Sequence, residues 1–269
     1  MDHKGTKKKV SRISVLHYWK MVFRSALFLA ALGLYIWNRV RGSALPFGEV
    51  GEMPVILAVI WLVFMVEMLL RFMPSSLESM GCQKQFAKNY RPTGADTTHV
   101  VVQSPWRTAA VAAAWFALNG AIGLLYHIGV IDAGILLLIS LAYSVCDMIC
   151  ILFFCPFQTW FMKNRCCATC RIYNWDFAMM FTPMVFVRRF YTWSLLGVSL
   201  LLLVQWEILL RRYPERFSEK TNACLSCGQC PEKLCQHKKQ LRSFLRQNTR
   251  KMQLAGNDLF CEERTKRTK

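Results

Sequence analysis

The stretch AGILLLISLAYSVCDMICILFFC, residues 133–155, contains a single charged side chain, Asp147. As a helix, about 20 apolar residues cross the ~30 Å hydrocarbon core of a bilayer. Four further runs of this kind occur, at Tyr18–Trp37, Met53–Met73, Thr108–Val130 and Phe190–Leu210. Helices satisfy their own backbone polar groups in lipid, and no alternating strand pattern indicates a barrel. The sequence therefore predicts an all-α, polytopic helical membrane protein with a short cysteine-rich metal-binding tail.

The distribution of charge divides the chain into three parts. Residues 1–17 form a basic N-terminus, residues 18–210 hold the transmembrane helices, and residues 211–269 form a basic, cysteine-rich tail. Lys and Arg near the ends of spans favour the cytoplasm, so we expect the N-terminus and the loops 74–106 and 156–176 to be cytoplasmic in a multi-pass protein of the cell membrane. The net charge of +18 is then mostly positive-inside charge that also attracts membrane lipid, and no nucleic-acid partner is expected.

The side on which the tail lies depends on the segment FAMMFTPMVFV, residues 177–187. It is too short to cross as a regular helix, and Pro183 and the following Arg188 and Arg189 interrupt it. We interpret it as an interfacial or re-entrant piece, or as a kinked extension of the last span. Five crossings would export the tail, although it holds fifteen Lys and Arg against six acids. Either this segment completes a sixth crossing or the charge rule fails, and we favour a cytoplasmic tail.

Four of the twelve cysteines lie close together in the tail as Cys224, Cys227, Cys230 and Cys235. Cys-x2-Cys spacing lets two sulfurs wrap one metal centre, and soft thiolates suit an iron–sulfur cluster or tetrahedral zinc. In a second interpretation, Cys227, Cys230 and Cys235 join His237 in a Cys3His zinc site. Disulfides would require an oxidising compartment. We expect a metal centre and rank the iron–sulfur cluster above zinc.

A second group of cysteines surrounds the end of the span 133–155 and the loop after it. Three or four of them are spaced to supply metal ligands at the membrane surface. These candidate ligands are Cys155, Cys166, Cys167 and Cys170. Cys146 and Cys150 lie four residues apart and share one helix face, and we interpret them as packing residues because Cys is small and apolar.

The stretch CILFFCPFQTWF, residues 150–161, ends a membrane helix and is followed by further clustered cysteines. It resembles the membrane-bound ferredoxin-type proteins of nitrate and nitrous-oxide reduction systems. Those proteins carry Cys-x3-Cys-Pro elements at helix ends, and they pass electrons from quinol to periplasmic partners. Here Cys150 and Cys155 are separated by four residues, and Pro231 follows the third tail cysteine. The resemblance implies electron transfer and no particular substrate.

Charged side chains inside the spans form another group. Glu67 and Asp147 each lie in the last third of a span, and Arg24 lies near the start of the first. Because successive spans alternate in direction, the three lie at similar depth. A buried acid in lipid is costly unless paired, so we expect an Arg24–Glu67–Asp147 cluster. It could serve as a proton path or a headgroup site, or it could be a structural salt bridge.

Two functions from different classes are compatible with these features. In the first, metal-bound cysteines relay electrons between a soluble donor protein and a membrane partner or quinone. In the second, zinc folds the tail into a docking or regulatory module on a membrane anchor. A Gly-rich phosphate loop, a nucleophile elbow and a zinc-protease motif are all missing from the sequence, so a hydrolase is unsupported.

Overall fold

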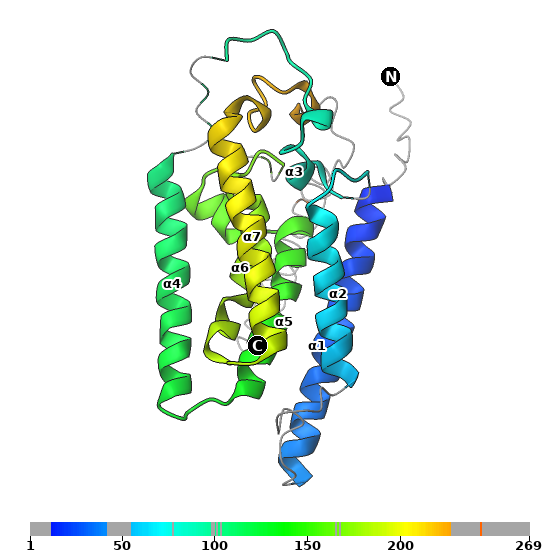
Figure 1. Ribbon diagram of the computed structural model, residues 1–269, viewed down its shortest axis with the longest axis vertical. Helices are drawn as coiled ribbons and strands as arrows, with labels where there is room; N and C mark the ends of the chain where they lie inside the picture. The colour runs from blue at the N-terminus through cyan, green and yellow to red at the C-terminus, as the bar shows by residue number, and fades with distance from the viewer. Residues whose placement is uncertain are drawn as a thin grey trace, which may run out of the picture.

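The computed structural model describes residues 12–41, 55–76, 78–97, 100, 102, 104–164, 166, 168–226 and 243. These residues are mostly helical, and the only β pairing among them is an isolated bridge between Pro92 and Asn222. The long helices of the bundle are α1 (Arg12–Arg41), α2 (Val55–Arg71), α4 (Pro105–His127), α5 (Ala133–Leu152) and α7 (Phe190–Arg212) (Figure 1).

Four of these helices, α1, α4, α5 and α7, are long and apolar enough to cross a membrane. Helix α2 is equally apolar but has 17 residues, which is about 25 Å at 1.5 Å per residue. The predicted all-α fold is therefore confirmed for the described residues, and four of their helices could span a membrane, as the prediction requires. Helix α5 ends at Leu152, earlier than the predicted Cys155. Pro156 disfavours a helical conformation at Cys155, the residue before it, so the helix does not continue to that position.

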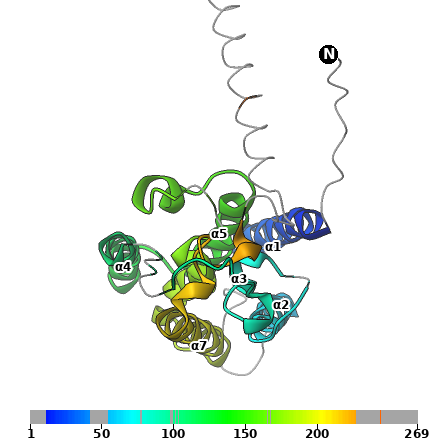
Figure 2. The same ribbon diagram turned by 90° about the horizontal axis from the view of Figure 1, so that it is seen from above.

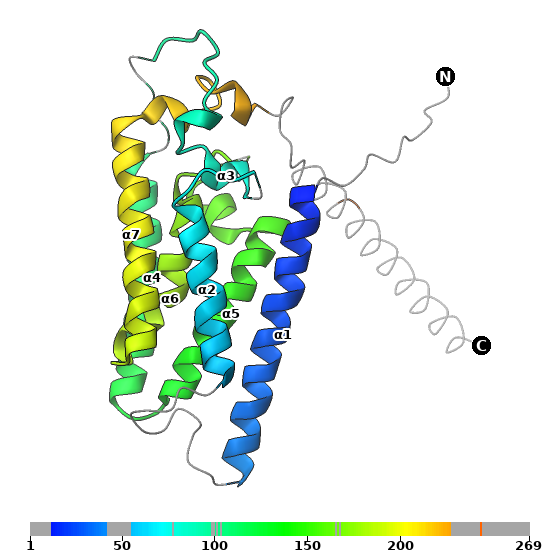
Figure 3. The same ribbon diagram turned by 45° about the vertical axis from the view of Figure 1, so that its right-hand side comes forward.

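Shorter elements connect the long helices. They are α3 (Met80–Gln83), η1 (Ala87–Asn89), the π-helical turn η2 (Phe157–Phe161), η3 (Arg171–Trp175), α6 (Asp176–Phe181), η4 (Thr182–Phe186), η5 (Pro214–Arg216) and η6 (Ala223–Leu225). Figure 3 shows that α1 begins near α3 and extends away from it, and we call this end of the bundle the α3 end.

The described residues pass six times between the two ends of the bundle. Helices α1 and α4 run away from the α3 end, and α2, α5 and α7 run toward it (Figure 1). The remaining passage is made by η3, α6 and η4. Arg171 donates to Glu207 near the end of α7, whereas the Val187 carbonyl accepts from Thr192 near its beginning. Residues 171–187 therefore run antiparallel to α7 along most of its length, and they do not extend it.

The irregular passage is possible because other helices enclose it. Phe177, Met180, Phe181 and Met184 are all buried, and they pack among α2, α5 and α7. Helix α6 ends at Phe181, and the 3-10 turn η4, which contains Pro183, follows it. Irregular backbone at membrane depth is tolerated where protein surrounds it. This shielding lets a segment too short for a regular transmembrane helix complete a passage.

The residues after α7 dock on the loop that contains α3. Phe217 is fully buried and packs edge-on against Trp206, with ring centroids 4.8 Å apart. The Ala223 amide donates to the Arg91 carbonyl at 2.8 Å, next to the bridge that joins Pro92 to Asn222. The first residues of the tail and the start of α1 therefore lie at the same end of the bundle.

Candidate functional site

Arg24 is the centre of a buried ionic cluster in the α3 half of the bundle. Its guanidinium is almost fully buried and contacts Glu67 of α2 at 2.6 Å and Asp147 of α5 at 3.1 Å. It also donates to the carbonyl of Ser144 at 3.2 Å. The three side chains that the sequence predicts at similar depth are thus in contact, and they tie α1, α2 and α5 together.

Arg71 extends this cluster toward the α3 loop. It contacts Asp176, the first residue of α6, at 2.6 Å and Glu78 at 3.7 Å. Lys20 joins Glu78 to Glu67, at 3.0 and 3.7 Å. Burial alone would raise the pKa of the Glu78 carboxyl, but the charges of Arg71 and Lys20 outweigh it and lower this pKa. One continuous network therefore connects the loop to the interior.

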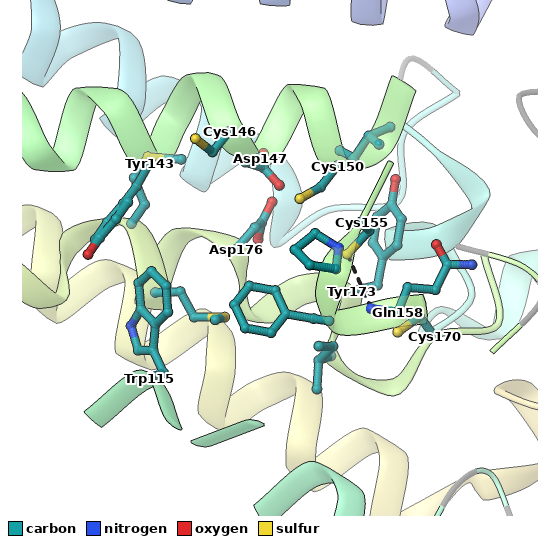
Figure 4. Close-up of a pocket in the computed structure, with 16 residues that line it drawn as sticks. Trp115, Tyr143, Cys146, Asp147, Cys150, Cys155, Gln158, Cys170, Tyr173 and Asp176 are labelled. Atoms are coloured by element: carbon teal, nitrogen blue, oxygen red, sulfur yellow. Dashed lines mark hydrogen bonds between the residues drawn. The ribbon is translucent and has the colours of Figure 1, made fainter. Parts of the chain in front are cut away.

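The network contains more acids than bases. Its acids are Glu67, Glu78, Asp147 and Asp176, and its bases are Lys20, Arg24 and Arg71. The carboxylates of Asp147 and Asp176 face each other and are close enough to repel (Figure 4). Each of the two carboxylates is also paired with an arginine, Asp147 with Arg24 and Asp176 with Arg71.

Asp147 and Asp176 also line a cavity of about 300 Å³. Its other walls are mostly apolar and aromatic, and they include Trp115, Tyr143 and Tyr173. A concave, largely apolar site with a few converging polar groups is typical of small-molecule binding. This cavity at the edge of the ionic network is our candidate functional site (Figure 4).

Cysteine side chains form part of the cavity wall. Cys150, at the end of α5, and Cys155, just after it, both line the cavity, and Figure 4 shows them as neighbours. The Cys155 sulfur accepts from the Gln158 backbone amide at 3.4 Å. Cys146 and Cys170 also contribute to the wall (Figure 4). Two neighbouring thiols beside a cavity can be oxidised together to a disulfide.

Other predicted ligands lie elsewhere or outside the described residues. Cys166 does not line the cavity, and its carbonyl accepts from Asn164 at 2.9 Å. Cys224 lies in η6, on the docked part of the tail. Cys167, Cys227, Cys230, Cys235 and His237 lie outside the described residues. Within the described part of the chain, no three His, Cys, Asp or Glu side chains are arranged to hold a metal ion.

Lys84 fixes the loop that carries Cys170. Its ammonium is fully buried and donates to the carbonyls of Ala168 at 2.7 Å and Cys170 at 2.9 Å. It lies over the rings of Trp206 and Phe217, at 5.1 and 5.5 Å. Burial lowers the pKa of Lys84 to about 8. One side chain thereby joins the α3 loop, the cysteine loop and the end of α7.

Three participants in the site do not follow from our sequence interpretation. Cys146 and Cys150 were assigned to packing, yet both line the cavity (Figure 4). Asp176 was not singled out, although it pairs with Arg71 and faces Asp147. The available signal for Asp176 was an acid directly before an apolar segment, which in a membrane protein needs a basic partner.

Comparison with protein-family models, with curated proteins and with solved structures found no match for this chain. The functional argument therefore depends on the geometry of the site.

Proposed function

We propose that this chain is a membrane-embedded redox protein that transfers electrons through the Cys150–Cys155 pair. The single observation that carries this proposal is the position of these two side chains as neighbours on the wall of an apolar cavity (Figure 4). The donor would be a soluble protein, and the acceptor would be a membrane partner or a quinone that enters the cavity from the membrane.

The chemistry is a two-electron thiol oxidation. The two S–H bonds break, one S–S bond forms, and two electrons and two protons pass to the quinone, which becomes a quinol. Thiolate is the reactive form of Cys, so a nearby proton acceptor speeds the reaction. Asp147 is three residues before Cys150 on the same helix face and lines the same cavity. Asp176 faces Asp147 at the same cavity (Figure 4).

The local backbone is compatible with disulfide formation. Cys155 lies beyond Phe153, the last capped position of α5, so its sulfur can approach Cys150 without breaking helical hydrogen bonds. A disulfide needs sulfur atoms about 2.05 Å apart, closer than hydrogen-bonded thiols.

We expect a short-chain quinone to oxidise the purified, reduced protein at this pair. Differential alkylation followed by peptide mass spectrometry should find one disulfide per chain, joining Cys150 to Cys155, together with stoichiometric quinol. Cys150→Ser and Cys155→Ser should each abolish both products, because one thiol alone cannot close the bond.

Cys82→Ser is the matched control. Cys82 is buried and donates to the Ser79 carbonyl at 3.0 Å, outside the cavity, so its replacement should leave quinone reduction unchanged. If quinone leaves Cys150 and Cys155 reduced in folded wild-type protein, or oxidises other cysteines instead, the proposed function is wrong.

A metal centre in the tail is the second candidate, as an iron–sulfur relay or, alternatively, as a zinc-folded docking module. One observation favours it: the docked residues hold Cys224 at the same end of the bundle as the cysteine loop. A centre that begins there could exchange electrons with the cavity thiols.

We expect Cys224→Ser, Cys227→Ser, Cys230→Ser and Cys235→Ser each to lower bound metal severalfold, because thiolate is the soft ligand. Elemental analysis of protein purified without air measures the loss and separates iron from zinc. Cys82→Ser should retain the wild-type metal content. Wild-type metal in all four tail variants would contradict the prediction.

A further inference from the structure

A groove lies between helix α4 and the rest of the bundle, between contacts near the two ends of α4. At the α3 end, Arg107 donates to the Met162 carbonyl at 3.2 Å. Near the other end, Gly123 approaches Phe186 so closely that a Cβ on Gly123 would overlap the ring. Figure 2 shows α4 at one edge of the bundle. Between these contacts, α4, α6, η4 and α7 enclose a groove of about 420 Å³.

Most side chains that line the groove are apolar, and among the described residues none of the lining side chains is charged. The most important polar side chain in the lining is that of Asn119. Asn119 lines the groove and is 2% exposed. Its Nδ2 donates to the Trp115 carbonyl at 2.9 Å, whereas its Oδ1 has no hydrogen-bond partner among the described residues. A buried acceptor without a partner costs about 1–3 kcal/mol, so this oxygen favours a ligand that brings a donor.

The neighbouring polar groups in the groove are already satisfied. Thr182 donates to the Ala178 carbonyl at 2.7 Å and accepts the Trp115 indole N–H at 3.1 Å. Among Trp115, Asn119 and Thr182, the acceptor without a hydrogen-bond partner is therefore Asn119 Oδ1. Trp115 and Met179 line both this groove and the cysteine cavity, so the two are neighbours.

We propose that this groove binds a lipid-soluble molecule with an apolar chain and one hydroxyl group, which donates to Asn119 Oδ1. The apolar lining, which includes Val185, Leu196 and Leu200, accommodates the chain, and a volume of about 420 Å³ is typical of ligand sites. No acidic or basic side chain lines the groove, so a neutral hydroxyl fits it better than a charged headgroup. This inference does not depend on the proposed redox function.

The test compares 4-octylphenol with 4-octylanisole, which has the same chain and ring but no hydroxyl donor. Equilibrium binding to the purified full-length protein in detergent can be measured by native mass spectrometry. We expect wild-type protein to bind the phenol about tenfold more tightly, as for one hydrogen bond to an otherwise unsatisfied acceptor. Asn119→Leu keeps the size of the side chain and removes the acceptor, so the two affinities should become equal.

A second variant tests the location without removing a polar group. A Cβ on Gly120 meets nothing within 4 Å, and Gly120 lines the groove. Gly120→Leu should therefore fill the groove and weaken both probes about tenfold or more. Gly33 in α1 has equally open space, so Gly33→Leu is the matched control and should bind as wild type does.

Equal binding of the two probes by wild-type protein would overturn the proposal, and it is the result expected if the groove holds only lipid acyl chains. A tenfold preference that persists in Asn119→Leu would also overturn it. So would unchanged binding in folded Gly120→Leu protein, because the ligand would then lie elsewhere.

Discussion

Arg24→Met is expected to cost about 3–5 kcal/mol of stability, because it leaves Asp147 without its arginine and Glu67 with only the more distant Lys20. For a chain of this size we expect the apparent melting temperature in detergent to fall by about 10 °C or more. Thermal unfolding of purified protein, followed by circular dichroism or size exclusion, measures the change.

Two further variants show whether the loss of stability comes from buried carboxylates left without a cation or from replacing any arginine. Arg41 is exposed at the far end of the same helix, so Arg41→Met should change stability by less than about 1 kcal/mol. Adding Asp147→Asn to Arg24→Met removes the carboxylate whose cation was lost and should recover part of the loss. If Arg24→Met melts like wild type, the buried network does not stabilise the bundle as the contacts indicate.

Cys166 and Cys224 are expected to be protected together from a membrane-impermeant thiol reagent in intact cells. Both lie at the α3 end, where the basic N-terminus also leads into α1. Lys and Arg near span ends favour the cytoplasm, so this end should face inward. Mass spectrometry of the purified protein after labelling identifies the modified cysteines, and permeabilised cells should give labelling of both.

The labelling needs a thiol on the other side as a control. Val130 lies in the turn between α4 and α5, at the opposite end, and is 64% exposed. The thiol introduced by Val130→Cys should be labelled in intact cells. Labelling of Cys224 without Cys166 would indicate five crossings and contradict the six passages. Labelling of Cys166 and Cys224, with the introduced thiol protected, would reverse the orientation but keep the two loops on one side.

The sequence by itself determined the class of protein and the depth of its charges. Long apolar runs have one stable form in lipid, so the helices follow from hydrophobicity alone. The pairing of Arg24 with Glu67 and Asp147 follows in the same way, because helix rise converts sequence position into depth and an acid in lipid needs a partner. Such arguments need only local periodicity and the thickness of a bilayer.

Only the tertiary structure decided how residues 171–187 are used. Their length and Pro183 argue against a regular crossing, and the segment completes a passage because α2, α5 and α7 surround it. It also brings Asp176 to Asp147, and the turn at Pro156 brings Cys155 to Cys150. Sequence spacing could not assign Cys150 to a site, because the partner of a side chain at a helix end depends on where the chain goes next. Enclosure by distant helices is a non-local property, so neither the sixth passage nor the cavity can be derived from a single segment.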